Sequence, residues 1–178
     1  VINSLIAVAN EDPSVSVTLP LTASALVADD FMTWLENTID SSGLEPKHLT
    51  FEIEAATFND YEHPTKALAH KLQAKGFSIS IAGVASDDLE NIWHLNPEFI
   101  HLTGELTTNL NAEEEQNSKA ALKAMIKESA EQNVLCIATN VTAAAELAQL
   151  WQTGVPFVQG DYLQTPLSAM NYEFSDIA

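Results

Sequence analysis

Few residues near the ends of the predicted strands have side chains suited to acid–base or metal chemistry. Glu52 and Glu54 close the β-like run Leu49–Glu54, and His101 lies near the end of the run Phe99–Leu102. In parallel α/β proteins the carboxyl ends of the strands are where reacting groups assemble. Glu52 and Glu54 share one strand face, so they fit a metal clip, an acid–base couple or simply a strand-end carboxylate pair.

Apolar and hydroxyl side chains occupy the other predicted strand ends, at Ala82, Gly83, Thr103, Thr139 and Thr142. Phosphodiester hydrolysis at neutral pH generally needs metal ions, and a glycosidase needs two carboxylates facing each other across a cleft. No second strand end offers such a carboxylate. Threonine hydroxyls can contact a ligand, and they also suit strand ends and helix caps. The pattern favours a binding module with no catalytic residue and no cofactor.

The histidines and the single cysteine give no metal site by their spacing. The five histidines are scattered, and Cys136 lies inside the apolar run Val134–Ala138. A lone cysteine cannot complete a zinc site, and a buried thiol is typical of a reducing compartment. His101 is the one histidine at a strand end, where it fits either a ligand contact or a core position. We therefore predict no metal site.

The charge of the chain limits the classes of partner that it can bind, because it has 25 acidic and 7 basic residues and contains no arginine. Arginine supplies the fork that recognises phosphates and guanine edges, and a net charge of −18 repels a polyanion. These features argue against nucleic acid as a partner and leave a basic protein partner open. No apolar stretch has the length of a membrane span, and no signal peptide is visible, so we expect a cytoplasmic chain.

Short runs rich in β-branched and aromatic residues alternate with helical patterns. Helical spacing joins Phe31, Trp34, Leu35 and Ile39 in one segment and Leu147, Leu150 and Trp151 in another, so we expect both tryptophans to face a sheet. Asp29 or Asp30 is expected to cap the first of these helices. The predicted strands are Val15–Leu19, Leu49–Glu54, Phe77–Gly83, Phe99–Leu102, Val134–Ala138 and Pro156–Gln159.

This alternation predicts an α/β fold with parallel strands and right-handed crossovers. The 178 residues suffice for one domain, either an open doubly wound sheet or part of a (β/α) TIM-like barrel. A complete barrel takes about 250 residues. We therefore expect a single domain over residues 1–178 that lacks an N-terminal strand and helix, as the C-terminal part of a larger multidomain protein.

Several segments resemble the EAL domain, the barrel of cyclic di-GMP phosphodiesterases. Leu49–Glu54, preceded by Gly43–Pro46, is similar to that family's strand ending in a glutamate. The stretch Gly154–Gly160 with Pro166 is similar to its closing strand and loop. The resemblance covers nearly the whole chain and implies an EAL-type barrel.

Most of the family's functional positions are changed in this sequence. Glu52 matches the metal-binding glutamate and Gln159 the glutamine of the closing Q-G pair, whereas the catalytic lysine falls on His101. The paired metal-bridging aspartates fall on Ala82 and Gly83. Other family positions fall on Pro20 (the metal-ligand asparagine), Thr22, Ala55, Thr103, Thr139 and Thr142. The resemblance therefore implies a degenerate, catalytically inactive domain.

The C-terminal part of the chain, with the stretches Leu150–Gly154, Leu163–Pro166 and Met170–Phe174, most resembles FimX-type regulators of type IV pili, which combine degenerate GGDEF and EAL domains. That resemblance implies cyclic di-GMP as ligand and a PilZ-domain protein or a pilus ATPase as partner, with homodimerisation left open. We favour a protein-interaction scaffold over a non-hydrolysing cyclic di-GMP receptor, and an active phosphodiesterase is the third reading. The candidate ligand-binding residues are Glu52, His101, Gln159, Gln164, Thr165 and Pro166.

Overall fold

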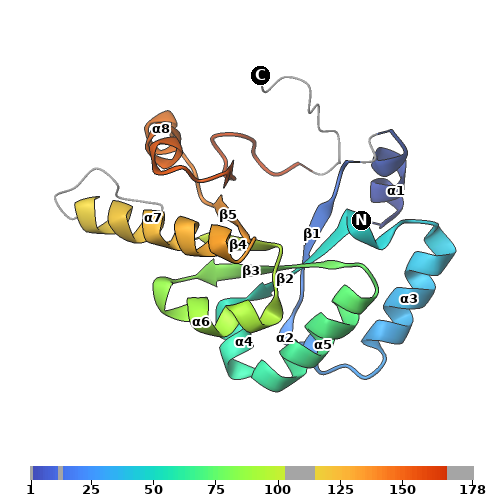
Figure 1. The fold of residues 1–178 in the computed structure, drawn as a ribbon. Helices are drawn as coiled ribbons and strands as arrows, with labels where there is room; N and C mark the ends of the chain where they lie inside the picture. Colours follow the sequence, from blue (N-terminus) through green and yellow to red (C-terminus); the bar gives the residue numbers. More distant parts are fainter. Residues whose placement is uncertain (1, 12–13, 103–114, 168–178) are drawn as a thin grey trace.

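A six-stranded parallel sheet, curled into a half-barrel, forms the centre of the computed structural model, which describes residues 2–11, 14–102 and 115–167. Each strand pairs with the next one along the chain, in the order β1-β2-β3-β4-β5-β6 (Figure 1). The strands are β1 Val17–Pro20, β2 Leu49–Glu54, β3 Ser78–Val84, β4 Phe99–Leu102, β5 Leu135–Ala138 and β6 Phe157–Val158.

Helices connect consecutive strands and lie around the outside of the curled sheet (Figure 1). This is the crossover arrangement that parallel strands require. The helices are α1 Ile2–Glu11, α2 Ala23–Leu26, α3 Phe31–Ser42, α4 Ala55–Asp60, α5 Glu62–Ala74, α6 Leu89–Ile92, α7 Glu115–Glu131 and α8 Ala144–Thr153. Short 3₁₀ helices are η1 Pro46–His48, η2 Ser86–Asp88 and η3 Trp93–Leu95.

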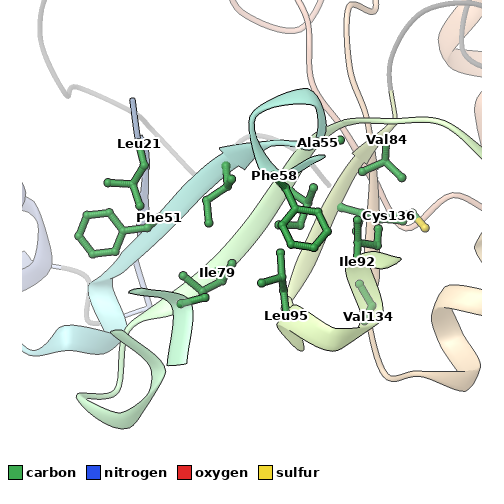
Figure 2. Close-up of a cluster of buried hydrophobic side chains, with 14 of the residues drawn as sticks. Leu21, Phe51, Ala55, Phe58, Ile79, Val84, Ile92, Leu95, Val134 and Cys136 are labelled. Atoms are coloured by element: carbon green, nitrogen blue, oxygen red, sulfur yellow. The ribbon is translucent and has the colours of Figure 1, made fainter. Parts of the chain in front are cut away.

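The hydrophobic core lies between the helices and the outer face of the sheet. Phe51 of β2 contacts Phe31 of α3, which shows which face of β2 is covered by helices. Ile79 and Ile81 of β3 are completely buried, and Figure 2 shows Ile79 with Phe58 of α4 and other members of this cluster. Burial of these branched and aromatic side chains is the main contribution to stability.

The opposite, inner face of the sheet carries the site. Since side chains alternate along a strand, Glu52 and Glu54 point away from Phe51 and toward the inside of the curl. The register pairs Glu52 with Ser80, and Ser80 with Phe99. His101 lies two residues beyond Phe99 and therefore shares this face.

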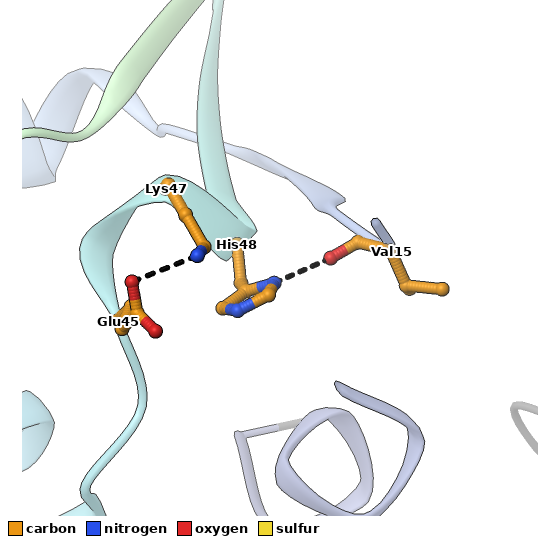
Figure 3. A network of polar contacts seen from close by, with 4 residues as sticks. All are labelled: Val15, Glu45, Lys47 and His48. Atoms are coloured by element: carbon orange, nitrogen blue, oxygen red, sulfur yellow. Dashed lines mark hydrogen bonds and ion pairs between the residues drawn. The ribbon is translucent and has the colours of Figure 1, made fainter. Parts of the chain in front are cut away.

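A buried histidine links the two segments that lead into β1 and β2. His48, at the end of η1, donates a hydrogen bond from Nδ1 to the carbonyl oxygen of Val15 at 2.6 Å (Figure 3). The neighbouring ion pair, Lys47 to Glu45 at 2.8 Å, is exposed and contributes little. His48 thus links the segment before β1 to the start of β2 and is a structural residue.

The predicted strands β2 and β4 have the observed bounds, and the other four differ at their ends. The expected positions of two tryptophans are wrong: Trp34 and Trp151 are 56% and 62% exposed, because α3 and α8 turn Leu35, Ile39 and Leu150 toward the core instead. The expected cap is also only partly right, since Asp30 is the N-cap of α3 but its side chain makes no capping hydrogen bond.

Candidate functional site

Glu52 and His101 meet on the inner face of the sheet. Nε2 of His101 lies 3.3 Å from Oε2 of Glu52, and the two side chains are 9% and 21% exposed. The strands that carry them are not neighbours, because β3 lies between β2 and β4. Neighbouring strands are about 4.8 Å apart, so the two side chains reach each other over β3, whose residues on this face, Ser80 and Ala82, are small.

Burial acts on both members of this pair. It raises the pKa of Glu52, and the negative charge of Glu54 raises it further. Burial also lowers the pKa of His101. In each case a low-polarity environment disfavours the charged form. Both pKa shifts therefore favour the neutral forms of the two groups over a charged ion pair.

The distance between the pair is that of an ion pair, but the geometry of a hydrogen bond is not reached, so Nε2 of His101 is buried without a hydrogen-bond partner. Oγ of Ser80 is buried and unpartnered as well. Ser80 was not a candidate in the sequence, where it is one hydroxyl in the run Ser78–Ile81. Its only signal there is its alternation with Ile79 and Ile81, which places it on the inner face.

Glu54 lies at the rim of the same face, and a glycine makes room for it. Gly83 has φ +68°, and a Cβ built on it would lie 3.0 Å from Oε2 of Glu54. The register of β3 with β4 shifts between Ile81 and Val84, so the regular pairing of the two strands is interrupted at this point. Gly83 therefore supplies a left-handed backbone that glycine adopts at low cost, and it leaves space for the carboxylate of Glu54.

The hydroxyl groups of Thr139 and Thr142, near the strand ends, donate hydrogen bonds to other groups of the protein. Thr139 donates through Oγ1 to the carbonyl oxygen of Leu102 at 3.1 Å. Thr142 donates to Oε2 of Glu146 through its backbone N–H at 2.7 Å and through Oγ1 at 3.1 Å, and Ala143 donates its N–H to the same oxygen. These bonds lower the pKa of Glu146 and cap α8. Thr103 falls outside the described residues.

The segment after β6 crosses over the end of β5. The backbone N–H of Gln159 donates a hydrogen bond to the carbonyl oxygen of Ala138. The carbonyl oxygen of Gln159 accepts a hydrogen bond from the backbone N–H of Val141. A Cβ on Gly160 would lie 2.2 Å from the carbonyl oxygen of Val141, so no other residue fits there without moving the backbone. Close contact with Val141 is thus a reason for glycine in the Gln159–Gly160 pair.

The structure brings together only two of the six candidate ligand residues, Glu52 and His101. Gln159 is exposed, Gln164 is half-buried, and Thr165 and Pro166 are exposed in the segment that follows β6. Within the described residues, no hydrogen bond or ion pair joins these four side chains to Glu52 or His101. Their proposed role as ligand contacts stays a prediction.

Parallel strands in sequential order, with helices outside and polar side chains at the strand ends, define a barrel-type α/β domain. The EAL domain model matches residues 1–166. This chain belongs to the EAL domain family, as the resemblance of its strand motifs predicts. Among the described residues, no helix has the length and apolar character needed to cross a membrane.

Solved structures of EAL domains have the same fold. The FimX EAL domain from Pseudomonas aeruginosa bound to c-di-GMP is 30% identical, with a TM-score of 0.86 over 98% of this chain and 71% of that one. The Xanthomonas citri FimX EAL domain in complex with c-di-GMP is 16% identical, with a TM-score of 0.86 over 97% of this chain and 68% of that one. PaMucR phosphodiesterase, also a c-di-GMP complex, is 19% identical, with a TM-score of 0.75 over 93% and 76%. No curated protein matches the chain.

The side chains at these strand ends do not fit the metal centre that the family implies. Mg²⁺ takes oxygen ligands in an octahedral array, and a site without substrate phosphates commonly needs more than one carboxylate. In the described part of the chain, no group of three or more His, Cys, Asp or Glu residues is placed to hold a metal ion. Glu52 is held against His101 and pairs with Ser80, and the next positions toward the carboxyl end of β3 that could supply a carboxylate are Ala82 and Gly83.

Proposed function

We propose that this EAL domain is a non-hydrolysing signalling module that acts as a protein-interaction scaffold in cyclic di-GMP-linked regulation. The observation that carries the proposal is the Glu52–His101 contact, which engages the one carboxylate matching the family's metal-binding glutamate. With Ala82 and Gly83 near the carboxyl end of β3, the site offers no ligand set for the two metal ions that phosphodiester hydrolysis would use. The domain transmits its signal by binding a partner in one arrangement better than in another.

Charge at the site favours a scaffold over a nucleotide receptor. Glu52 and Glu54 lie on one face at the strand ends, and the chain has no arginine to bind a phosphate in a bidentate manner. A dianionic dinucleotide therefore meets two carboxylates and no guanidinium from this chain. By resemblance, a PilZ-domain protein or a pilus ATPase is the proposed partner class, and the proposed location is the cytoplasm.

A second candidate function is a cyclic di-GMP receptor that leaves the nucleotide intact. The similarity to the Pseudomonas aeruginosa FimX EAL domain favours it, because that domain, 30% identical to this chain, is bound to c-di-GMP in its crystal structure. In this case Glu52, His101, Gln159, Gln164, Thr165 and Pro166 are the residues that we propose for the ligand site.

Calorimetric titration of cyclic di-GMP into the longest polypeptide that contains this chain separates these functions. Magnesium is present throughout, and the nucleotide is assayed for cleavage afterwards. We expect no heat at high micromolar ligand and no cleavage. Tight binding of intact nucleotide would favour the receptor, whereas a linear product would overturn both proposals. PaMucR phosphodiesterase, handled in parallel, verifies that the assay detects cleavage.

A further inference from the structure

An open cavity of about 340 Å³ lies at the amino ends of β3, β4 and β5. Its walls come from the end of α5 and from the segments that lead into these three strands, so it lies opposite the carboxyl strand ends already described. Small-molecule sites occupy about 300–1,000 Å³, and this cavity falls in that range. Its polar lining residues are Gln73, Ser78, Asn96, Glu98, Gln132 and Asn133.

The lining side chains whose hydrogen bonds the structure fixes present acceptors to a ligand. Nε2 of Gln73 donates to the carbonyl oxygens of Leu95 and Asn96 at 2.9 and 2.8 Å, so the oxygen is the part of this amide that is left for a ligand. The hydroxyl of Ser78 donates to Oε2 of Glu98, which leaves lone pairs on both groups. A ligand that satisfies these groups therefore brings hydrogen-bond donors.

The same cavity is poorly suited to an anion. Glu98 is the one charged side chain among its described lining residues, and none of these residues is Lys, Arg or His. The net charge of −18 also attracts cations to the chain as a whole. Several backbone N–H groups of the lining already donate to carbonyl oxygens of the protein, namely those of Phe77, Asn96, Glu98, Gln132 and Asn133.

We propose that this cavity binds a guanidinium group, from an arginine side chain of another protein or from a free alkylguanidine. A guanidinium has five N–H donors in a planar fork that pairs with a carboxylate through two parallel hydrogen bonds. Glu98 receives this fork, because Ser78 uses only one of its lone-pair positions. Asn96 and Asn133 can turn their amide oxygens toward the remaining donors. The chain itself contains no arginine, so the group comes from another molecule.

Binding to the unchanged protein is measured by ¹H–¹⁵N NMR titration with three probes. These are agmatine, arginine blocked at both ends as amides, and citrulline blocked in the same way, which has a neutral urea group in place of the guanidinium. We expect millimolar agmatine or blocked arginine to shift the backbone amides of Asn96, Glu98 and Asn133.

Charge-assisted pairing predicts about tenfold weaker binding of the citrulline probe. Tighter binding of blocked arginine than of agmatine would indicate a protein as the source of the group, and the reverse order would indicate a free alkylguanidine. Equal binding of the citrulline probe, or no shift of these amides at millimolar ligand, would overturn the inference.

A matched pair of variants separates the cavity from general attraction to an acidic chain. Glu98→Gln and Glu90→Gln each remove one negative charge from an exposed residue, and Glu90 of α6 does not line the cavity. We expect Glu98→Gln to weaken agmatine binding about tenfold and Glu90→Gln to leave it unchanged. Circular dichroism verifies that both variants are folded.

Equal weakening in the two variants, or no weakening in Glu98→Gln, would overturn the inference. The titration contains no cyclic di-GMP and reads the opposite end of the sheet from Glu52 and His101. Its failure would therefore leave the proposed function unchanged, and failure of the proposed function would leave this site unchanged.

Discussion

The two faces of the same sheet differ in how completely their side chains are covered. On the outer face, Ile79, Ile81 and Ile100 are completely buried beneath helices. On the inner face, Ser80 and Ala82 in the middle of the sheet are also buried, but Leu135 and Phe157 on β5 and β6 are 39% and 47% exposed. The outer face holds the fold together, whereas the inner face is where residue types can change with less loss of stability.

The largest expected effect compares one residue on each face. Ile81→Ala should lower the free energy of unfolding by about 2–5 kcal/mol, because it leaves a cavity in a packed core. Phe157→Ala should cost about 1 kcal/mol, because only half of the side chain is removed from water. Urea denaturation measures both. Equal losses of unfolding free energy in the two variants would show that both faces contribute alike to stability, which would contradict the difference between them.

A smaller effect is expected where the rim of the inner face is closely packed. Gly160→Ala should cost about 1–3 kcal/mol, because its Cβ would overlap the backbone of Val141. Gly43→Ala is the matched control: its left-handed φ costs about 1 kcal/mol, and nothing lies near its Cβ. Amide NMR shifts of Val141 and Tyr162 should change in the first variant only. Unchanged shifts in Gly160→Ala would contradict the close contact.

The smallest effect concerns the pH dependence of stability on the inner face. Burial raises the pKa of Glu52 above its unfolded value, so between pH 4.5 and the folded pKa the native state binds more protons than the unfolded state. The wild-type protein should therefore lose stability relative to Glu52→Gln as pH rises through that window. Thermal unfolding across pH measures this difference, and a constant difference would contradict the assigned burial.

The contribution of Glu146 to the pH dependence of stability has the opposite sign to that of Glu52, so Glu146 serves as the internal control for that measurement. Hydrogen bonds from Thr142 and Ala143 lower its pKa. Its contribution to stability is present above pH 4.5 and is lost as pH falls through the folded pKa. Wild type and Glu146→Gln should therefore converge at low pH, in contrast to wild type and Glu52→Gln.

The strand pattern and the family could be predicted from the sequence because both depend on local order. The run Leu49–Glu54 alternates and ends in two carboxylates, and its bounds are those observed. Helix α4 was missed because Ala55–Asp60 is short and has no repeated apolar spacing. The tryptophan positions were wrong because helical spacing defines a wide apolar face, of which α3 and α8 bury only a part.

The central contact of the site could not be predicted from spacing alone. Glu52 and His101 were each candidates, but their meeting depends on the curl of the sheet and on small side chains on the strand between them. The buried hydroxyl of Ser80 has no sequence signal beyond alternation. The threonines at the strand ends could be named from the sequence, while their hydrogen-bond partners within the protein became visible only in the structure.

The sequential order of the strands has a consequence for the way the chain folds. Each strand pairs with the one that follows it, so every step of sheet growth joins segments that are close together along the chain. The entropy of closing each connection is therefore modest, and no strand must wait for a distant one. Strand–helix units can add one after another during synthesis, from the N-terminal side onward.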